Sequence, residues 1–262
     1  MNDKGQGFDF MEMKSFLDEK VDAFNKISFI DDDPISVPHQ FTERRDIEIA
    51  AFLTASIAWG NRKSILKSAG RMMDFLDNRP YEFVIGHTAS DIKSLSKFVH
   101  RTFNGQDFIS FIRCLSAAYH RHPSLEDLFL IAGGEEYPLS EAISRFRNDF
   151  FSAPHAARSE KHVSDPMSGS AAKRINMFLR WMVRHDNRGV DFGLWNKISP
   201  SALSIPLDVH SGNIARKLGL LSRKQNDQKA VLELDAVLRQ FDRADPCKYD
   251  FALFGLGAIE GF

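Results

Sequence analysis

Apolar residues recur at helical spacing along nearly the whole chain, and this periodicity limits the possible folds more than any other feature. Residues 43–59 are typical. One helix face, at i, i+3, i+4, i+7, i+10 and i+11, carries Ile47, Ala50, Ala51, Thr54, Ile57 and Ala58. Similar patterns predict helices over 11–26, 61–76, 106–121, 139–151, 231–241 and 246–258. Only 204–207 resembles an extended segment, and its proline argues against a central strand, so the sequence predicts an all-α fold.

Polar residues and glycines mark the expected helix ends. Thr42 is a candidate N-cap for the helix over 43–59, and Gly60 is expected to end it. Asn61 is expected to cap the next helix. Further along, Asp208 precedes a helix that is expected to end at Gly219, and a cap is the simplest role for its carboxylate.

A polar segment rich in Ser, His and Pro, residues 152–169, separates two helical halves. We therefore expect two helical lobes with a groove between them. The first lobe would hold residues 43–165, and the second would hold 166–262. Residues 1–42 would supply an N-terminal helix that packs on the second lobe.

Composition excludes several classes of protein. With 34 Lys and Arg against 35 Asp and Glu, the net charge is −1, so any nucleic-acid binding depends on local basic patches. The two cysteines form no C-x-x-C pair, so neither a zinc site nor an iron–sulfur cluster is expected, and two thiols fit a reducing cytoplasm. No signal peptide and no apolar stretch long enough to span a membrane is found, and a cytoplasmic protein without membrane partners is expected.

A turn of small residues over 168–172 leads into a helix in which Lys173 occupies the first turn. Such a turn exposes unpaired backbone N–H groups that can hold a phosphate. The positive end of the helix dipole and the neighbouring Arg174 both favour a neutral amine on Lys173, which is the nucleophilic form. The stretch containing Asp208 is the second candidate; Asp208 and His210 form a D-x-H pair, but no third ligand has matching spacing, so no metal site is expected.

Together these stretches resemble the helix-hairpin-helix DNA glycosylase superfamily, and in particular its 8-oxoguanine glycosylase-like branch. In that family a Gly-x-Gly-x-Lys hairpin opens a helix, and a Pro-Val-Asp-x-His segment precedes another helix that reads x-x-Arg-x-Leu-Gly. Here Gly169 and Lys173 are in register while Ala171 replaces the second glycine, and 205–210 with 215–220 match the second element. The resemblance covers roughly residues 43–76 and 165–258. The chain is also similar in style to an uncharacterised bacterial family of unknown function, which is expected to contain its nearest relatives.

The resemblance implies a base-excision repair enzyme without a cofactor, acting on double-stranded DNA that carries a damaged base such as an oxidised purine. Lys173 would attack the sugar C1′ as a Schiff-base nucleophile with β-lyase activity, and Asp208 would assist base loss. The amides of Gly169, Ser170 and Ala171 would hold a DNA phosphate. Asn61 would either fill the gap left by the flipped base or contact the base that had been its partner.

The remaining site candidates are basic or aromatic residues near these elements. The expected DNA contacts are completed by Arg62, Lys63, Arg174, His210 and Arg216. Trp59 and Trp181 are expected in the base pocket, although a core position is the simpler explanation for Trp181.

Two other functions stay open at this point. A non-catalytic nucleic-acid-binding protein that keeps the fold fits the net charge and the altered hairpin. A helical interaction scaffold would leave the basic clusters unexplained.

Overall fold

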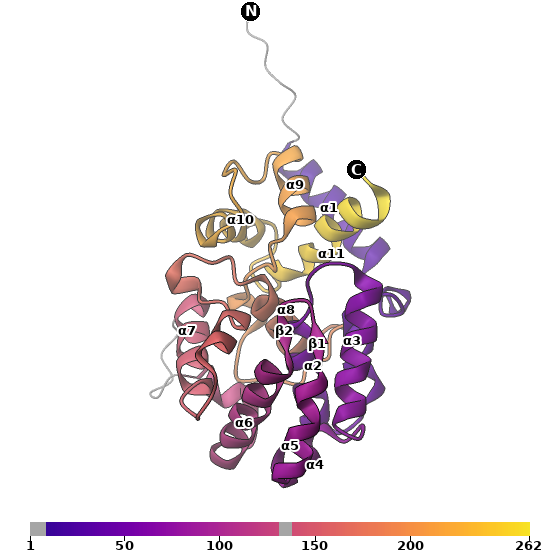
Figure 1. Ribbon diagram of the computed structural model, residues 1–262. Helices are drawn as coiled ribbons and strands as arrows, with labels where there is room; N and C mark the ends of the chain where they lie inside the picture. Colours follow the sequence, from indigo (N-terminus) through magenta and orange to yellow (C-terminus); the bar gives the residue numbers. More distant parts are fainter. Residues whose placement is uncertain (1–8, 131–137) are drawn as a thin grey trace, which may run out of the picture.

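The computed structural model describes residues 9–130 and 138–262. Helices make up most of the described chain, which confirms the all-α prediction (Figure 1). The α-helices of this part are α1 (Phe10–Phe24), α2 (Arg44–Ser56), α3 (Arg62–Phe75), α4 (Pro80–Gly86), α5 (Ala89–Ser94), α6 (Gly105–Arg121), α7 (Leu139–Phe150), α8 (Lys173–Val183), α9 (Val209–Lys217), α10 (Gln228–Phe241) and α11 (Tyr249–Gly255).

The strands and short helices connect these elements. Strands β1 (Val99–His100) and β2 (Phe103–Asn104) form an antiparallel hairpin, which the sequence does not reveal because each strand has only two residues. The segment 204–207 has no strand partner. Two 3-10 turns lie near the site described below, Pro34–Ser36 and Pro166–Ser168.

Helix capping agrees with the sequence at two positions and differs at one. Asn61 caps α3 by accepting a hydrogen bond from the Ser64 amide at 3.1 Å, and Asp208 caps α9, both as predicted. The prediction for Thr42 is wrong, because Glu43 caps α2 by accepting hydrogen bonds from the Arg45 and Asp46 amides. A carboxylate beside the positive end of the helix dipole supplies a charge that threonine lacks.

The buried side chains form two hydrophobic clusters. The larger surrounds α2, α6 and α7, and the smaller joins α1, α9, α10 and α11. Figure 1 shows α1, α9, α10 and α11 together at one end of the molecule, with α8 between them and the other helices. The first helix packs on α11, through Leu17 and Val21 in the smaller cluster.

Helix α8 belongs by packing to the larger cluster. Its predicted apolar face, from Ile175 to Val183, is buried against α2. The expected division at residue 166 therefore does not follow the packing: Ala171 lies in the smaller cluster, and the helix that begins two residues later lies in the larger.

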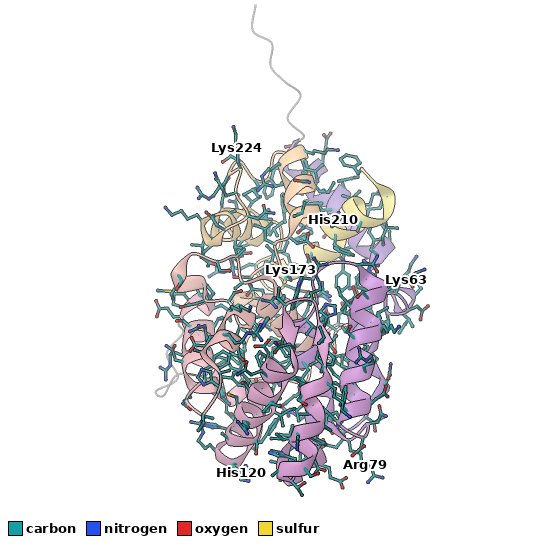
Figure 2. All side chains as sticks on the ribbon, in the orientation of Figure 1. Lys63, Arg79, His120, Lys173, His210 and Lys224 are labelled. Atoms are coloured by element: carbon teal, nitrogen blue, oxygen red, sulfur yellow. The ribbon has the colours of Figure 1, made fainter. Side chains whose placement is uncertain are left out.

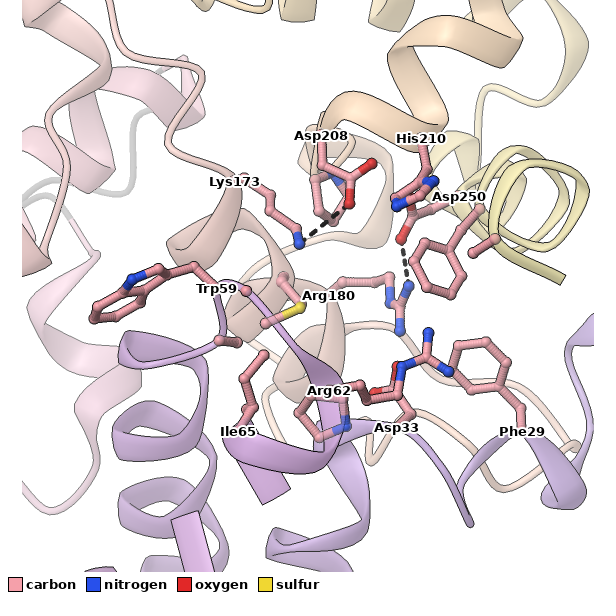
Figure 3. Close-up of a pocket in the computed structure, with 17 residues that line it drawn as sticks. Phe29, Asp33, Trp59, Arg62, Ile65, Lys173, Arg180, Asp208, His210 and Asp250 are labelled. Atoms are coloured by element: carbon pink, nitrogen blue, oxygen red, sulfur yellow. Dashed lines mark hydrogen bonds and ion pairs between the residues drawn. The ribbon is translucent and has the colours of Figure 1, made fainter. Parts of the chain in front are cut away.

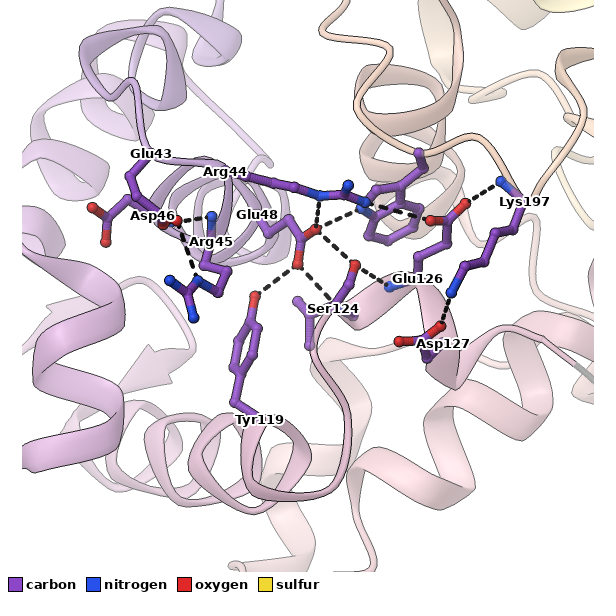
Figure 4. A network of polar contacts seen from close by, with 12 residues as sticks. Glu43, Arg44, Arg45, Asp46, Glu48, Tyr119, Ser124, Glu126, Asp127 and Lys197 are labelled. Atoms are coloured by element: carbon purple, nitrogen blue, oxygen red, sulfur yellow. Dashed lines mark hydrogen bonds and ion pairs between the residues drawn. The ribbon is translucent and has the colours of Figure 1, made fainter.

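A buried carboxylate ties the larger cluster together. Glu48 of α2 is fully buried and accepts hydrogen bonds from the Tyr119 hydroxyl, the Ser124 hydroxyl, the Leu125 amide and the Trp195 indole (Figure 4). Arg44 approaches the same carboxylate at 3.2 Å. An ionised carboxylate can be buried in this way because hydrogen bonds and a counter-charge compensate for the lost water.

Candidate active site

Lys173 is the first residue of α8, and the chain enters that helix through two left-handed residues. Gly169 has φ of 90° and Ala172 has φ of 47°. Glycine adopts this conformation freely, whereas alanine pays roughly 1–2 kcal/mol for it. The alanine that precedes the candidate nucleophile therefore holds a strained backbone conformation.

The side chains of Lys173 and Asp208 meet across the boundary between the two clusters. The distance from Lys173 Nζ to Asp208 Oδ2 is 3.2 Å, and the two side chains are 33 % and 16 % exposed (Figure 3). The residues come from different helices and lie 35 positions apart, since 208 − 173 = 35. Two groups that are distant in the sequence are therefore in direct contact.

Asp208 is held by the start of α9. Its Oδ1 accepts hydrogen bonds from the Ser211 amide at 2.9 Å and the Ser211 hydroxyl at 3.1 Å, and its own carbonyl accepts one from the Asn226 side chain. Burial by itself would raise the pKa of Asp208, but the Lys173 ammonium and the Ser211 hydrogen bonds outweigh it and lower that pKa. Asp208 is thus a fixed, ionised acceptor beside the lysine.

Two adjoining cavities share this pair of residues. One is a pocket of about 300 Å³, and the other is a more open groove of about 520 Å³. Both are lined by Trp59 and Gly60 after α2, by Lys173, and by Asp208 and His210. The groove continues past Ser170 and Ala171, along the turn that precedes α8. The lysine amine therefore stands where a groove meets a pocket.

The pocket is lined by buried charges that form ion pairs. Arg180 of α8 donates to Asp250 of α11 and, from Nε at 3.2 Å, to Asp191. Burial alone would lower the pKa of Arg180, but the two carboxylates raise it above its usual range. Burial also raises the pKa of Asp250 to about 6, against the opposing charge of Arg180. A third carboxylate, Asp33, lines the same pocket.

Aromatic side chains line another part of the pocket. Phe29 and Phe254 lie with ring centroids 6.1 Å apart, and His210 lies edge-on to Phe254. The Arg62 guanidinium lies 5.3 Å from the centroid of the Phe254 ring. Flat apolar surfaces of this kind are suited to stacking against a planar ligand.

The structure places several expected contact residues near the two cavities. Arg62 and His210 line the pocket, and His210 also lines the groove. Asn61 is exposed at the start of α3, next to Gly60, and Lys63 is exposed one residue beyond Arg62. Figure 2 shows Lys173 and His210 close together near the centre of this view, with Lys63 and Lys224 further out and His120 and Arg79 at the far end.

Two expected site residues, Trp181 and Arg216, lie away from the two cavities, and a third, Arg174, lines the groove but is held by protein contacts. The prediction that Trp181 lines the base pocket is wrong, because its side chain is completely buried in the larger cluster. The Arg174 guanidinium lies on the Trp59 ring and donates to the Ser56 carbonyl, and the residue is partly buried at the edge of the groove. Burial lowers its pKa to about 10. Arg216 donates to the Arg223 carbonyl and to the Asn226 side chain, so it braces the loop between α9 and α10.

The turn before α8 offers fewer free amides than expected. The amides of Ser168 and Gly169 donate to the Asp165 and Pro166 carbonyls, and the Ser170 amide donates to Asp165 at 3.4 Å. The Ala172 amide donates to the Ser170 hydroxyl. A phosphate at this turn would depend on the remaining amides and on the side chains that line the groove.

Sequence reasoning missed the charged residues of the pocket. Asp33 follows two other aspartates and precedes Pro34, a pattern typical of an exposed turn. The ion pair of Arg180 with Asp250 joins positions 70 residues apart, so no local pattern reveals it. Arg180 lies on the polar side of α8 with Lys173 and Arg184, so the amphipathic pattern of this helix does not signal that the arginine is buried.

Residues 33–259 match the family described as "Protein of unknown function (DUF2400)". The chain belongs to this family. The match begins at Asp33 and spans every residue that lines the two cavities except Phe29, so nearly the whole candidate site lies within the family's region. No curated protein and no solved structure matches the chain significantly. Within residues 9–130 and 138–262, no helix combines the length and the apolar character needed to cross a bilayer.

Proposed function

We propose that the protein is a DNA base-excision glycosylase with β-lyase activity, and that Lys173 forms the Schiff base. The observation that supports this most is the 3.2 Å contact of Lys173 with Asp208 at the junction of a pocket and a groove. In the superfamily that the sequence resembles, glycosylases with β-lyase activity use a lysine and an aspartate at these two motif positions. A structural ion pair has no need to stand between two cavities.

The chemistry follows from the positions of the two groups. Lys173 first loses a proton to Asp208, and its amine then attacks C1′ of the damaged nucleotide. The bond from C1′ to the base breaks, and the base leaves with the bonding electrons and takes up a proton. Nζ then gives up one proton and O4′ takes one up as the bond from C1′ to O4′ breaks, so that the opened sugar holds an iminium between Nζ and C1′. Loss of a C2′ proton then expels the 3′-phosphate by β-elimination.

The two cavities suit the two parts of such a substrate. The pocket volume of about 300 Å³ lies at the lower end of the range for small-molecule sites, roughly 300–1,000 Å³. A single flipped base would enter the pocket, beside Phe254 and His210, while the strand would follow the groove past Ser170. An oxidised purine is the first lesion to test, on family resemblance.

A second function, nucleic-acid binding without catalysis, is favoured by one specific observation. Most amides of the turn before α8 are bonded internally, so the phosphate grip expected of the hairpin is reduced. A binding protein that has lost its chemistry would tolerate this change.

Borohydride trapping separates the two functions. The full-length protein is incubated with labelled duplexes that carry 8-oxoguanine, oxidised pyrimidine, uracil or an abasic site, and borohydride is added. The enzyme proposal predicts a covalent adduct, because hydride reduces the iminium to a stable amine. The adduct should be absent from Lys173→Ala and unchanged in Lys93→Ala, which replaces an exposed lysine of α5.

The outcomes lead to different conclusions. A folded Lys173→Ala protein that still binds DNA without forming an adduct supports the proposal, with thermal unfolding as the control for folding. An adduct that persists in Lys173→Ala refutes the role of this lysine. Wild-type protein that binds the duplexes and forms no adduct supports the binding function instead.

A further inference from the structure

Asp33 is a buried carboxylate with one oxygen left unpaired at the pocket. The Asp33 residue is 8 % exposed and lines the pocket. Oδ1 accepts the Ile35 amide at 3.0 Å and caps the 3-10 turn Pro34–Ser36. Within the described residues, Oδ2 has no hydrogen bond and no ion pair, and because it is not sealed from solvent it faces the pocket as a free acceptor. A ligand in the pocket can supply the missing donor.

Arg62 is an unpaired donor at the same pocket. Its guanidinium lies against the Phe254 ring and makes no hydrogen bond or ion pair with the described residues. Arg62 and Asp33 do not pair with each other, whereas Arg180 is already bonded to Asp191 and Asp250. Figure 3 shows Asp33 and Arg62 on the opposite side of the pocket from Lys173 and Asp208.

The charges around Asp33 act on its protonation in opposite directions. Burial raises the pKa of Asp33, and the positive charges of Arg180, Arg62 and Lys173 oppose this effect. An N–H donor of a bound ligand would also lower the pKa of Asp33, because a hydrogen bond donated to a carboxylate favours its ionised form.

We infer that Asp33 and Arg62 select flipped bases by their lactam edge, a ring N–H next to a carbonyl. An ionised carboxylate only accepts hydrogen bonds and a guanidinium only donates them, so the two together match an N–H and a C=O. Guanine, hypoxanthine and uracil types carry this edge. Adenine and cytosine types present a ring acceptor and an amino group in its place, which would set acceptor against acceptor and donor against donor.

This inference rests on the proposed function for the source of the base, but the pocket chemistry can be measured without catalysis. Hypoxanthine and adenine differ only in the edge concerned. Calorimetric titration of the full-length protein with each free base should give about tenfold or tighter binding of hypoxanthine, from the cost of leaving buried groups unpaired. Asp33→Asn should reduce this preference severalfold, because an amide can present either a donor or an acceptor.

Asp32→Asn is the matched control. It removes the same charge one position earlier, at an exposed residue, and should leave the preference unchanged. In Asp33→Asn the carbonyl oxygen of the new side chain can still accept the Ile35 amide, and thermal unfolding checks that this variant keeps its fold. Arg62→Gln should weaken hypoxanthine binding more than adenine binding.

The free-base titration tests the inference and the trapping assay tests the glycosylase proposal, so each can be refuted without the other. Preference for hypoxanthine that depends on Asp33, without any borohydride adduct, supports the inference and refutes the glycosylase proposal. The inference is overturned if adducts form equally with 8-oxoguanine and 8-oxoadenine and if free hypoxanthine and free adenine bind equally. The glycosylase proposal is then still supported. Binding of neither free base also overturns the inference.

Discussion

Replacing Glu48 by glutamine tests whether the buried network of the larger cluster depends on an ionised carboxylate. Each carboxylate oxygen accepts from a group that can only donate: Oε1 from the Trp195 indole at 2.9 Å, and Oε2 from the Leu125 amide at 3.1 Å (Figure 4). The glutamine amide replaces one of these oxygens with an NH₂ group. Whichever way the amide is turned, an N–H therefore faces an N–H.

The expected cost follows from this conflict. One buried N–H left without an acceptor costs about 1–3 kcal/mol, and the bonds that remain lose the strengthening that a charged acceptor gives. Part of this loss is offset because the substitution removes a buried charge. Arg44 is nearly half exposed, so water can solvate its guanidinium when the ion pair is lost. We expect Glu48→Gln to reduce the free energy of unfolding by about 2–4 kcal/mol.

Urea unfolding followed by tryptophan fluorescence and by circular dichroism measures this difference. Glu19→Gln is the control, because Glu19 is exposed on α1 and its replacement should change stability by less than about 0.5 kcal/mol. A loss smaller than about 1 kcal/mol for Glu48→Gln, with an unchanged m value, would refute the reasoning.

Two further predictions concern Asp208 and His162. Asp208→Asn should keep the helix cap and the stability but slow adduct formation roughly 100-fold or more, since the proton acceptor is lost. Asp208→Ala should in addition reduce the free energy of unfolding in urea by about 1 kcal/mol, because the cap is lost. Equal rates of adduct formation in Asp208→Asn and wild type would contradict the role of this carboxylate. Burial lowers the pKa of His162 to about 4. The unfolded chain therefore binds a proton that the folded chain excludes between pH 6.5 and 4, and stability should fall by about 2–3 kcal/mol as pH drops through that window. His162→Gln should remove most of this slope in urea unfolding measured at several pH values, and an unchanged slope would assign the pH dependence to other groups.

Features set by short stretches of chain could be predicted from the sequence. The apolar face of α8 and the caps at Asn61 and Asp208 depend on residues within one or two helical turns. The meeting of Lys173 with Asp208 was expected from family resemblance, and no local pattern in the chain requires it.

Features set by packing could not be predicted. The amphipathic pattern around Trp181 is the same whether its ring lies in a pocket or in the core. Only the packing of α8 on α2 determines that the ring is buried. The sequence predicts Arg174 as a DNA contact because its charge is visible, whereas the Ser56 carbonyl that holds it lies 118 residues away. Asp33 was overlooked for the same reason, since nothing in its neighbourhood indicates burial.

Because α8 packs in the larger cluster, the distance between Lys173 and Asp208 depends on how the two hydrophobic clusters are oriented. Lys173 moves with the larger cluster, through the helix it begins, and Asp208 moves with the smaller one, through the neighbouring Leu207 and Ile214. Because the two groups are 3.2 Å apart, a small change in the relative orientation of the clusters would be enough to break their contact. If Lys173 is the nucleophile proposed above, a ligand that contacts both clusters would alter its protonation through the distance to Asp208, without touching the lysine itself.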